Sequence, residues 1–130
     1  MAGGYTHKNV LEAADAAERF GFAETHESRF PSKDLETEQT GFAFHRFKPG
    51  KRQPFGHMHN DAEEVYFVVS GSGRMKLDDD VIELEPLDAV RVSAGVMRAF
   101  DAGADGLAIL AFGPRRADDR GDVVQDWWSD

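Results

Sequence analysis

The sequence predicts an all-β domain, an antiparallel sandwich or barrel, with one short helix before it. From Thr40 onward, six short apolar runs alternate with Gly, Pro and Asp breaks, and little helical pattern separates them. Closely spaced runs of this kind are typical of antiparallel sandwiches and barrels. Residues 9–20 have their apolar side chains at helical spacing instead, which places the helix before the strands.

The segment from Asn9 to Phe20 is expected to form a single helix, over about residues 10–20. Asn9 can cap its first turn, and Glu12 three residues later completes a capping-box-like pattern. Gly21 is well placed to end the helix in the left-handed conformation. The apolar stripe favours a helix laid against the outside of the domain over one that binds a partner.

The six apolar runs are the expected strands, and in order they read GFAFHRF, EVYFVVSG, RMKL, VIEL, AVRVS and LAILAF. The acidic run Asp78 to Asp80 separates RMKL from VIEL and is interpreted as a hairpin turn rather than a metal site. Near the C-terminus, Trp127 and Trp128 follow a polar stretch. Exposure of both rings would be costly, so we expect them to dock on this barrel or on a neighbouring subunit.

Length and composition predict one domain without disulfides. The 130 residues include no cysteine, which excludes thiolate metal sites and cysteine nucleophiles. A net charge of −9 argues against nucleic acid or an anionic membrane as the main partner. With no recognisable export signal or membrane-spanning run, the expected location is the cytoplasm. We expect three segments: an N-terminal extension over 1–35, the barrel over 36–114 and a C-terminal tail over 115–130.

Two histidines and a glutamate give the strongest chemical signal in the chain. On a strand, His57 and His59 would present both imidazoles on one face, and Glu64 begins the next strand after a turn. If the two faces meet, two imidazoles and one carboxylate form a three-ligand divalent site with positions left for water or substrate. Such ligands leave zinc, iron, manganese, nickel and copper open as the metal.

The segment HMHNDAEEVYFVVSGSG resembles the first cupin motif, in which a Glu follows HxH and a Gly closes the strand. His57, His59, Glu64 and Gly71 have the spacing of that motif, while Gly50 lies one residue further upstream than the usual Gly. The resemblance covers roughly residues 42–112. It implies a jelly-roll barrel of six to eight strands with a pocket inside, and a homodimer.

The second cupin motif corresponds to LEPLDAVRVSAGVMRAF, which keeps the residues of the turn and the second glycine of that motif, Leu84, Pro86, Asp88 and Gly95. Ser93 stands where the motif usually has Pro. Arg98 stands where the motif usually has its fourth metal ligand, a histidine. A guanidinium stays protonated and has no lone pair for a metal, so this position decides how the pocket works.

Two outcomes for Arg98 are open. In the first, it forms a fork-shaped pair with Glu64, the two histidines complete a polar network, and the pocket holds no metal. In the second, His57, His59 and Glu64 hold a divalent ion, and Arg98 turns toward the mouth to bind the anionic part of a ligand. Tyr66 and Phe100 are further candidate ligand-binding residues, although most barrel aromatics simply belong to the core.

The predicted role is a barrel pocket for a small polar or anionic molecule, and three functional hypotheses follow. The first is a metal-dependent enzyme, as the resemblance to dioxygenase- and isomerase-like cupins implies. The second is a metal-free enzyme with a histidine as general base and Arg98 as the group that stabilises an anion. The third is a non-catalytic binding or sensor module. A DNA-binding regulator is disfavoured because no helix-turn-helix accompanies the barrel.

Overall fold

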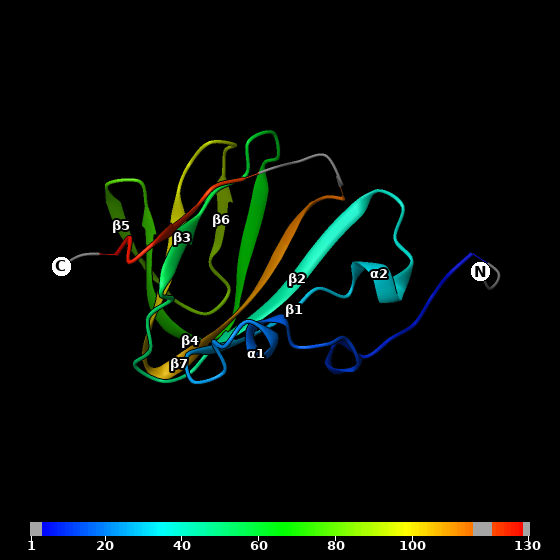
Figure 1. Cartoon of the computed structure of the whole chain (residues 1–130), viewed down its shortest axis with the longest axis horizontal. Coiled ribbons are helices and arrows are strands. Elements are labelled where there is room, and N and C mark those ends of the chain that lie inside the picture. Colours follow the sequence, from blue (N-terminus) through cyan, green and yellow to red (C-terminus); the bar gives the residue numbers. More distant parts are fainter. Residues whose placement is uncertain (1–3, 116–120, 129–130) are drawn as a thin grey trace.

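A single curled antiparallel sheet of eight strands forms the domain in the computed structural model, which describes residues 4–115 and 121–128 (Figure 1). In chain order the strands are β1 (His26–Arg29), β2 (Thr40–Phe47), β3 (Phe55–His57), β4 (Glu64–Leu77), β5 (Asp80–Leu84), β6 (Ala89–Val92), β7 (Arg98–Pro114) and β8 (Val123–Gln125). The hydrogen-bonded order runs β1-β2-β7-β3-β8, and β4 joins β7 to β5 and β6. The predicted all-β barrel is confirmed.

The two longest strands, β4 and β7, organise the sheet. They pair from Val65 opposite Phe112 to Leu77 opposite Arg98, with irregular register near Gly71. The sequence analysis expected separate strands for EVYFVVSG and RMKL, with Gly71 closing the first. That expectation is wrong, because β4 continues through Gly71 to Leu77 and the glycine marks a bulge within it. A bulge bends a strand and increases its twist, which lets the sheet curl.

Gly71 and Gly106 face each other at this bend, on β4 and β7. Both have left-handed backbones, with φ of 80° and 78°. A Cβ atom added at Gly71 would lie 2.1 Å from the carbonyl oxygen of Gly106, far inside contact distance. Glycine is therefore required at position 71 both by the backbone conformation and by the close approach of the two strands.

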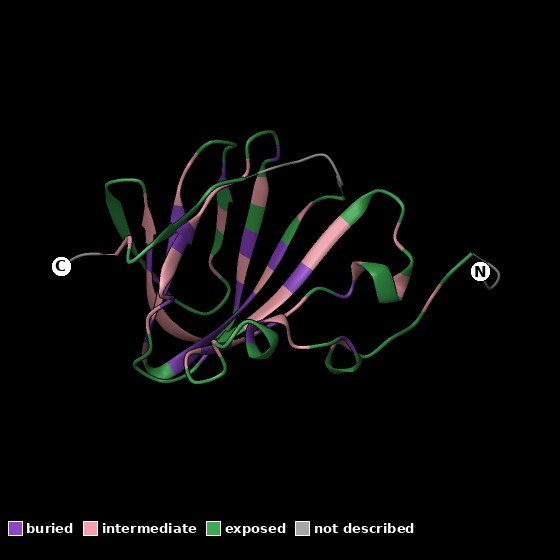
Figure 2. Ribbon diagram, viewed as in Figure 1, coloured by how far each residue is buried: buried purple, intermediate pink, exposed green. Residues whose placement is uncertain are grey.

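The hydrophobic core lies inside the curl. Most buried residues fall on the strands, and exposed ones fall mainly on loops and edges (Figure 2). The side chains with the least exposure include Phe47, Val68, Met75, Phe100, Leu107 and Ile109. The expected hairpin at the acidic run is confirmed, since Leu77 pairs with Asp80 and Asp78 has the turn conformation with φ of 51°.

The predicted single helix over residues 10–20 is wrong in its extent. The structure has a 3₁₀ turn at Val10–Glu12 and a separate four-residue helix, α1, at Ala16–Arg19. The expected cap at Asn9 is confirmed, because its side chain accepts from the Leu11 amide. The left-handed Gly21, with φ of 85°, follows α1 as expected.

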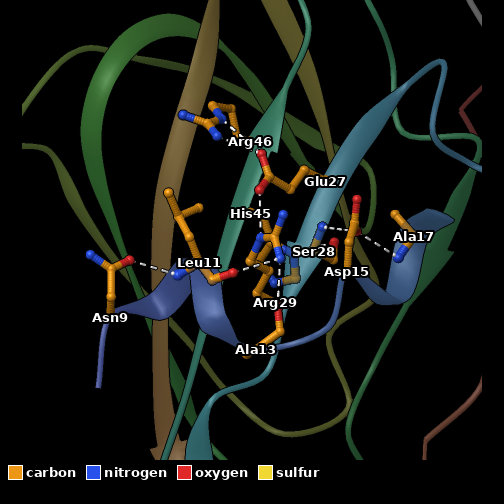
Figure 3. Close-up of polar contacts among 10 residues, drawn as sticks. All are labelled: Asn9, Leu11, Ala13, Asp15, Ala17, Glu27, Ser28, Arg29, His45 and Arg46. Carbon is orange, nitrogen blue, oxygen red and sulfur yellow. Dashed lines mark hydrogen bonds and ion pairs between the residues drawn. The ribbon is translucent and has the colours of Figure 1, made fainter. Parts of the chain in front are cut away.

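Hydrogen bonds from β1 explain the break between the two turns (Figure 3). The Arg29 guanidinium donates to the Ala13 carbonyl at 2.5 Å, and so takes an acceptor that a continuous helix would use. The Asp15 carboxylate accepts from the amides of Ala17 and Ser28, at 3.0 and 2.9 Å. A side chain that bonds nearby backbone groups in this way competes with the helix and starts a new one.

Both segments outside the predicted barrel add a strand to the sheet. In the N-terminal extension, β1 pairs with β2, and the short helix α2 (Ser32–Leu35) also contacts β2. In the C-terminal tail, β8 pairs with β3. The predicted segment boundaries at 36 and 114 stay predictions. Among the described residues, every helix is too short or too polar to cross a membrane.

The two tryptophans dock on this chain's own barrel, one of the two alternatives expected. A Cβ atom on Gly56 of β3 would lie 2.5 Å from the Trp127 ring, so the indole packs directly on that strand. The Lys76 ammonium lies 4.3 Å from the centre of the Trp127 ring. The Arg52 guanidinium lies 4.7 Å from the centre of the Trp128 ring. Cations over aromatic faces are favourable contacts.

We expect Gly71→Ala to lower the free energy of unfolding by about 3–5 kcal/mol, from left-handed strain together with the collision with Gly106. Gly21→Ala is the matched control, because Gly21 has nearly the same φ but no atom within 4 Å of the added Cβ. It should cost only about 1 kcal/mol. Urea unfolding followed by circular dichroism measures both, and equal losses would contradict the close approach described here.

Candidate functional site

A cavity of about 480 Å³ lies inside the curled sheet, and residues of the N-terminal segment complete its wall. Most of the wall is apolar. Six of the lining side chains are those of phenylalanine or tyrosine: Phe20, Phe22, Phe30, Phe42, Phe55 and Tyr66. The volume falls in the range of clefts that bind small molecules, which are also mainly apolar with a few placed polar groups.

The predicted trio lines this cavity. His57 ends β3, His59 follows two residues later, and Glu64 begins β4. All three are half-buried, and one ligand atom from each lies within 4.8 Å of the others. This separation is compatible with a single divalent ion between them. The sequence prediction that the three side chains converge is therefore confirmed.

Backbone pairing holds the two histidines in place. His57 pairs with Arg98 across β3 and β7. The His59 carbonyl accepts from the Gly95 amide at 2.8 Å. The intervening Met58 amide donates to the Asp122 carbonyl at 3.0 Å. The loop that follows β3 is thus fixed on both sides, and this restricts the directions the imidazoles can take.

Glu64 is the electrostatic centre of the site. Its Oε1 atom accepts a hydrogen bond from the Tyr66 hydroxyl, and it lies 3.4 Å from His59 Nε2 and 3.6 Å from Arg98 Nη1. Burial opposes ionisation of this carboxyl, but the bonds from His59 and Tyr66 and the neighbouring imidazoles lower its pKa to about 2. Glu64 is therefore a carboxylate throughout the physiological range.

The protonation states of His57 and Tyr66 follow from burial. Burial is the main cause that lowers the His57 pKa to about 4, and Arg98 and His59 add to it, so this imidazole is neutral. Its Nδ1 atom is buried and has no hydrogen-bond partner within the described structure. Burial and the Glu64 charge raise the Tyr66 pKa, which keeps the phenol protonated as a donor. A neutral imidazole beside a carboxylate is the form in which these groups bind metals.

Arg98 is completely buried beside the trio and does not form the predicted fork-shaped pair. Its only ion pair with Glu64 is the single 3.6 Å contact, and its Nη2 atom donates to the Ser93 carbonyl at 3.3 Å. The Nε and Nη1 atoms have no hydrogen-bond partner within the described residues. The side chain is fully enclosed, and its charge faces Glu64. A turn toward the mouth remains a prediction for a metal-bound state.

The three predicted ligand-binding residues differ in their positions. Tyr66 lines the cavity, whereas Arg98 and Phe100 are not part of its wall. Phe100 lies in the core behind Tyr66, with ring centres 5.2 Å apart and the two rings edge to face. The Phe47 ring also packs against Phe100, with ring centres 5.6 Å apart. Contact between a ligand and any of these side chains stays a prediction.

The cavity wall contains a second polar group that was not predicted from the sequence, formed by His26, Ser28 and His45. The Ser28 hydroxyl and His45 Nδ1 are hydrogen-bonded at 2.7 Å. Burial lowers the His26 pKa, and burial together with the neighbouring histidines lowers the His45 pKa to about 3. The signal for His45 was present, because it lies two residues after the inward-facing Ala43 on β2 and therefore shares its face.

A curled antiparallel barrel with a cavity, and an HxH pair and a glutamate on its inner wall, has the architecture of the jelly-roll class of β-barrels. The cupin domain family matches residues 43–111, more than half of the chain. The chain therefore belongs to the cupin domain family, and the resemblance seen in its motifs is confirmed. A comparison with curated proteins found none with significant similarity.

Solved structures of other cupin-like barrels resemble this one. A cupin protein from Bacteroides fragilis is 21% identical, with 98% of each chain covered and a TM-score of 0.70. The polyketide cyclase RemF from Streptomyces resistomycificus is 16% identical, with 96% of this chain and 87% of that chain covered and a TM-score of 0.72. A protein assigned as a sugar phosphate isomerase from Acidithiobacillus ferrooxidans is 23% identical, with a TM-score of 0.64; the match covers 75% of this chain but only 64% of that one. These likenesses show the fold.

We expect acid to destabilise the protein through His26 and His45. Their pKa values in the folded state lie below the ordinary value of 6.5, that of His45 at about 3, so the unfolded chain takes up more protons at these two positions as the pH falls below 6.5. His45 then removes about 1.4 kcal/mol of stability per pH unit between about pH 6 and 4, and His26 adds to the loss in the same direction. Urea unfolding at several pH values measures this slope. The His45→Asn variant should lower this slope by the contribution of about one proton taken up on unfolding. The His7→Gln variant, which changes an exposed histidine, is the control.

We expect Glu64→Gln to destabilise metal-free protein by about 3 kcal/mol, because it leaves the buried Arg98 without its counter-charge. The double variant Glu64→Gln with Arg98→Met removes the unpaired charge and should recover a large part of this loss. Urea unfolding after treatment with a chelator measures both. If the double variant is no more stable than the single one, Arg98 does not depend on Glu64.

Proposed function

We propose that this cupin is a metal-dependent protein for a small molecule that combines an apolar body with an anionic or other oxygen-bearing group. The convergence of His57, His59 and Glu64 on the wall of a 480 Å³ cavity carries the proposal. The cavity supplies room and apolar contact for the body of the ligand. The trio supplies a position for one divalent cation.

The donor set fits a divalent metal. Two imidazoles and one carboxylate are ligands that zinc, iron, manganese and nickel share, and three protein ligands leave positions for water or substrate. The buried Nδ1 atom of His57, which has no hydrogen-bond partner among the described residues, is a polar atom that such an ion, or a ligand, would satisfy. A metal bound here would act as a Lewis acid that polarises an oxygen of the bound molecule.

The charges around the trio favour an anionic group on the ligand. Arg98 brings one fixed positive charge to within 3.6 Å of the Glu64 carboxylate, so this pair is neutral on its own. A divalent ion would then leave the site with excess positive charge in a partly buried place. An anionic oxygen of the ligand would offset that charge, because electrostatic interactions strengthen in a less polar environment.

The chain's own side chains have separate parts in this proposal. His57, His59 and Glu64 hold the ion, and Tyr66 orients the carboxylate by its hydrogen bond. The aromatic rings of the wall exclude water around the body of the ligand. The fold does not select the reaction, because one scaffold serves unrelated chemistries. Proteins named as a cyclase and as an isomerase are both among the similar structures. An isomerase- or dioxygenase-like reaction remains the leading expectation from the family.

A metal-free binding or sensor module is the second candidate. The contact between Arg98 and Glu64 favours it, since a fully buried guanidinium already places a cation beside the carboxylate. In this case the pocket binds an anionic molecule without an ion. The homodimer and the cytoplasmic location are further proposals, and the first can be tested by size-exclusion chromatography with light scattering.

We expect about one zinc, iron, manganese or nickel ion per chain in untagged protein purified without chelators or immobilised metal. Elemental analysis measures this content, and zinc titration by calorimetry measures the affinity of chelator-treated protein. His57→Ala should lower zinc affinity at least 10-fold, because it removes one of three ligands. His7→Ala, which removes an exposed imidazole, is the matched control.

Arg98→His separates the two candidates further. It removes a repulsive cation and offers a third imidazole as a fourth ligand, so zinc affinity should rise in this variant if the trio is a metal site. Protein that holds no metal, and takes up none in either the natural or the Arg98→His form, would overturn the metal-dependent proposal in favour of the metal-free one.

A further inference from the structure

A second polar cluster lies in the same cavity, on β1 and β2 instead of β3 and β4. It consists of His26, Ser28 and His45, and all three line the cavity wall. Ser28 and His45 lie side by side on paired strands, with the Ser28 hydroxyl 2.7 Å from His45 Nδ1 (Figure 3). These residues are separate from His57, His59 and Glu64, the three proposed metal ligands that are called the metal trio below.

His26 gives an independent sign of a missing partner. Only 4% of this residue is exposed, yet it lines the cavity, and its Nδ1 atom has no hydrogen-bond partner within the described structure. Its ring is enclosed by aromatic neighbours, with centres 5.8 Å from Phe22 and 5.0 Å from Phe47. Buried polar atoms nearly always have a partner, so this one points to a group supplied by a ligand.

His45 is arranged to meet a group that can both donate and accept. The serine hydroxyl occupies Nδ1, which leaves Nε2 as the ring nitrogen for a ligand. The tautomer decides whether Nε2 donates or accepts, and the serine hydroxyl can match either one. A ligand hydroxyl can also donate and accept, so it suits His45 in both tautomers.

Charge argues for a neutral group. His26 and His45 are held neutral by burial, and the Asp15 carboxylate accepts from the Ser28 amide behind the strand. The negative charge of Glu64 also reaches His45 through the cavity. No lysine or arginine is among the described residues that line the cavity, so a carboxylate or phosphate beside this cluster would lack a cation from the wall, whereas a hydroxyl needs none.

We propose that Ser28, His45 and His26 form a second binding subsite that recognises a hydroxyl group of an aromatic ligand. The inference rests on the proposed function in one respect, since it takes the cavity as the ligand site. The ligand then carries an acidic group toward His57, His59 and Glu64, a ring against the aromatic wall, and a hydroxyl group toward His45. The cluster therefore determines specificity at the end of the ligand away from the metal trio.

Two pairs of soluble aromatic acids test this subsite. The probes are 4-hydroxybenzoate with benzoate, and 6-hydroxy-2-naphthoate with 2-naphthoate, so that two lengths are covered. Isothermal titration calorimetry on the full chain gives the dissociation constants, with and without added zinc. The hydroxylated member of at least one pair should bind about 3- to 10-fold more tightly, as one net hydrogen bond provides.

Variants assign the preference to the cluster. His45→Phe and Ser28→Ala should each bring the ratio within a pair close to one, while the affinity for the acid without the hydroxyl changes less than about 2-fold. Ser32→Ala is the matched control, because Ser32 also lines the cavity but its hydroxyl oxygen already accepts from the Phe42 amide. Circular dichroism checks folding, and Ser28→Ala decides if His45→Phe does not fold.

The outcomes separate the two proposals. A hydroxyl preference that is lost in Ser28→Ala but is the same with and without zinc supports the subsite even if the metal proposal fails. A ratio near one for both pairs in the natural protein, or no detectable binding of any probe, overturns the subsite. Affinity that rises with zinc in all four probes bears on the metal proposal alone.

Discussion

The pairing of β4 with β7 is the constraint on which the rest of the structure depends. These strands stay hydrogen-bonded over most of their length, yet they bend together where Gly71 of β4 meets Gly106 of β7. The bend curls one sheet over itself. Arg98 at the start of β7 and Glu64, which lies near the opposite end of that strand, thereby come within 3.6 Å of each other. The candidate site exists because a backbone close approach, possible only for glycine, closes the barrel.

Inside the curled sheet, the candidate site is arranged around a single carboxylate, that of Glu64. Glu64 is ionised although it is partly buried, because the Tyr66 hydroxyl and the His59 imidazole lie at one of its oxygens, and the Arg98 guanidinium forms an ion pair with the same oxygen. The partners are positioned by strands, so little rearrangement is needed to keep the negative charge in place. The same carboxylate can face a cation from the protein or a cation from solution, and the two candidate functions differ in which of these it uses.

The sequence predicted the barrel, the hairpin at Asp78 and the convergence of the trio, because these follow from local patterns and fixed spacing. The helix over residues 10–20 was wrong, since Arg29 and Asp15 form long-range hydrogen bonds that no local pattern reveals. Continuation of β4 through Gly71 was missed, because a glycine in a strand reads equally as an end or as a bulge. The single contact between Arg98 and Glu64 in place of a fork-shaped pair, and the exclusion of Phe100 from the cavity wall, depend on packing between distant strands.

The packing of Trp127 on Gly56 has a practical consequence for work in solution. The chain has two tryptophans in all, and both belong to the C-terminal segment that contacts the barrel beside β3. Indole emission is sensitive to nearby charge and to access of water, and Gly56 is the residue directly before His57. The tryptophan fluorescence of the protein therefore comes from one place on β3, one residue from His57 and on the face of the strand away from the cavity. It offers a label-free optical reporter of the packing of the C-terminal segment on β3 that needs no engineered probe.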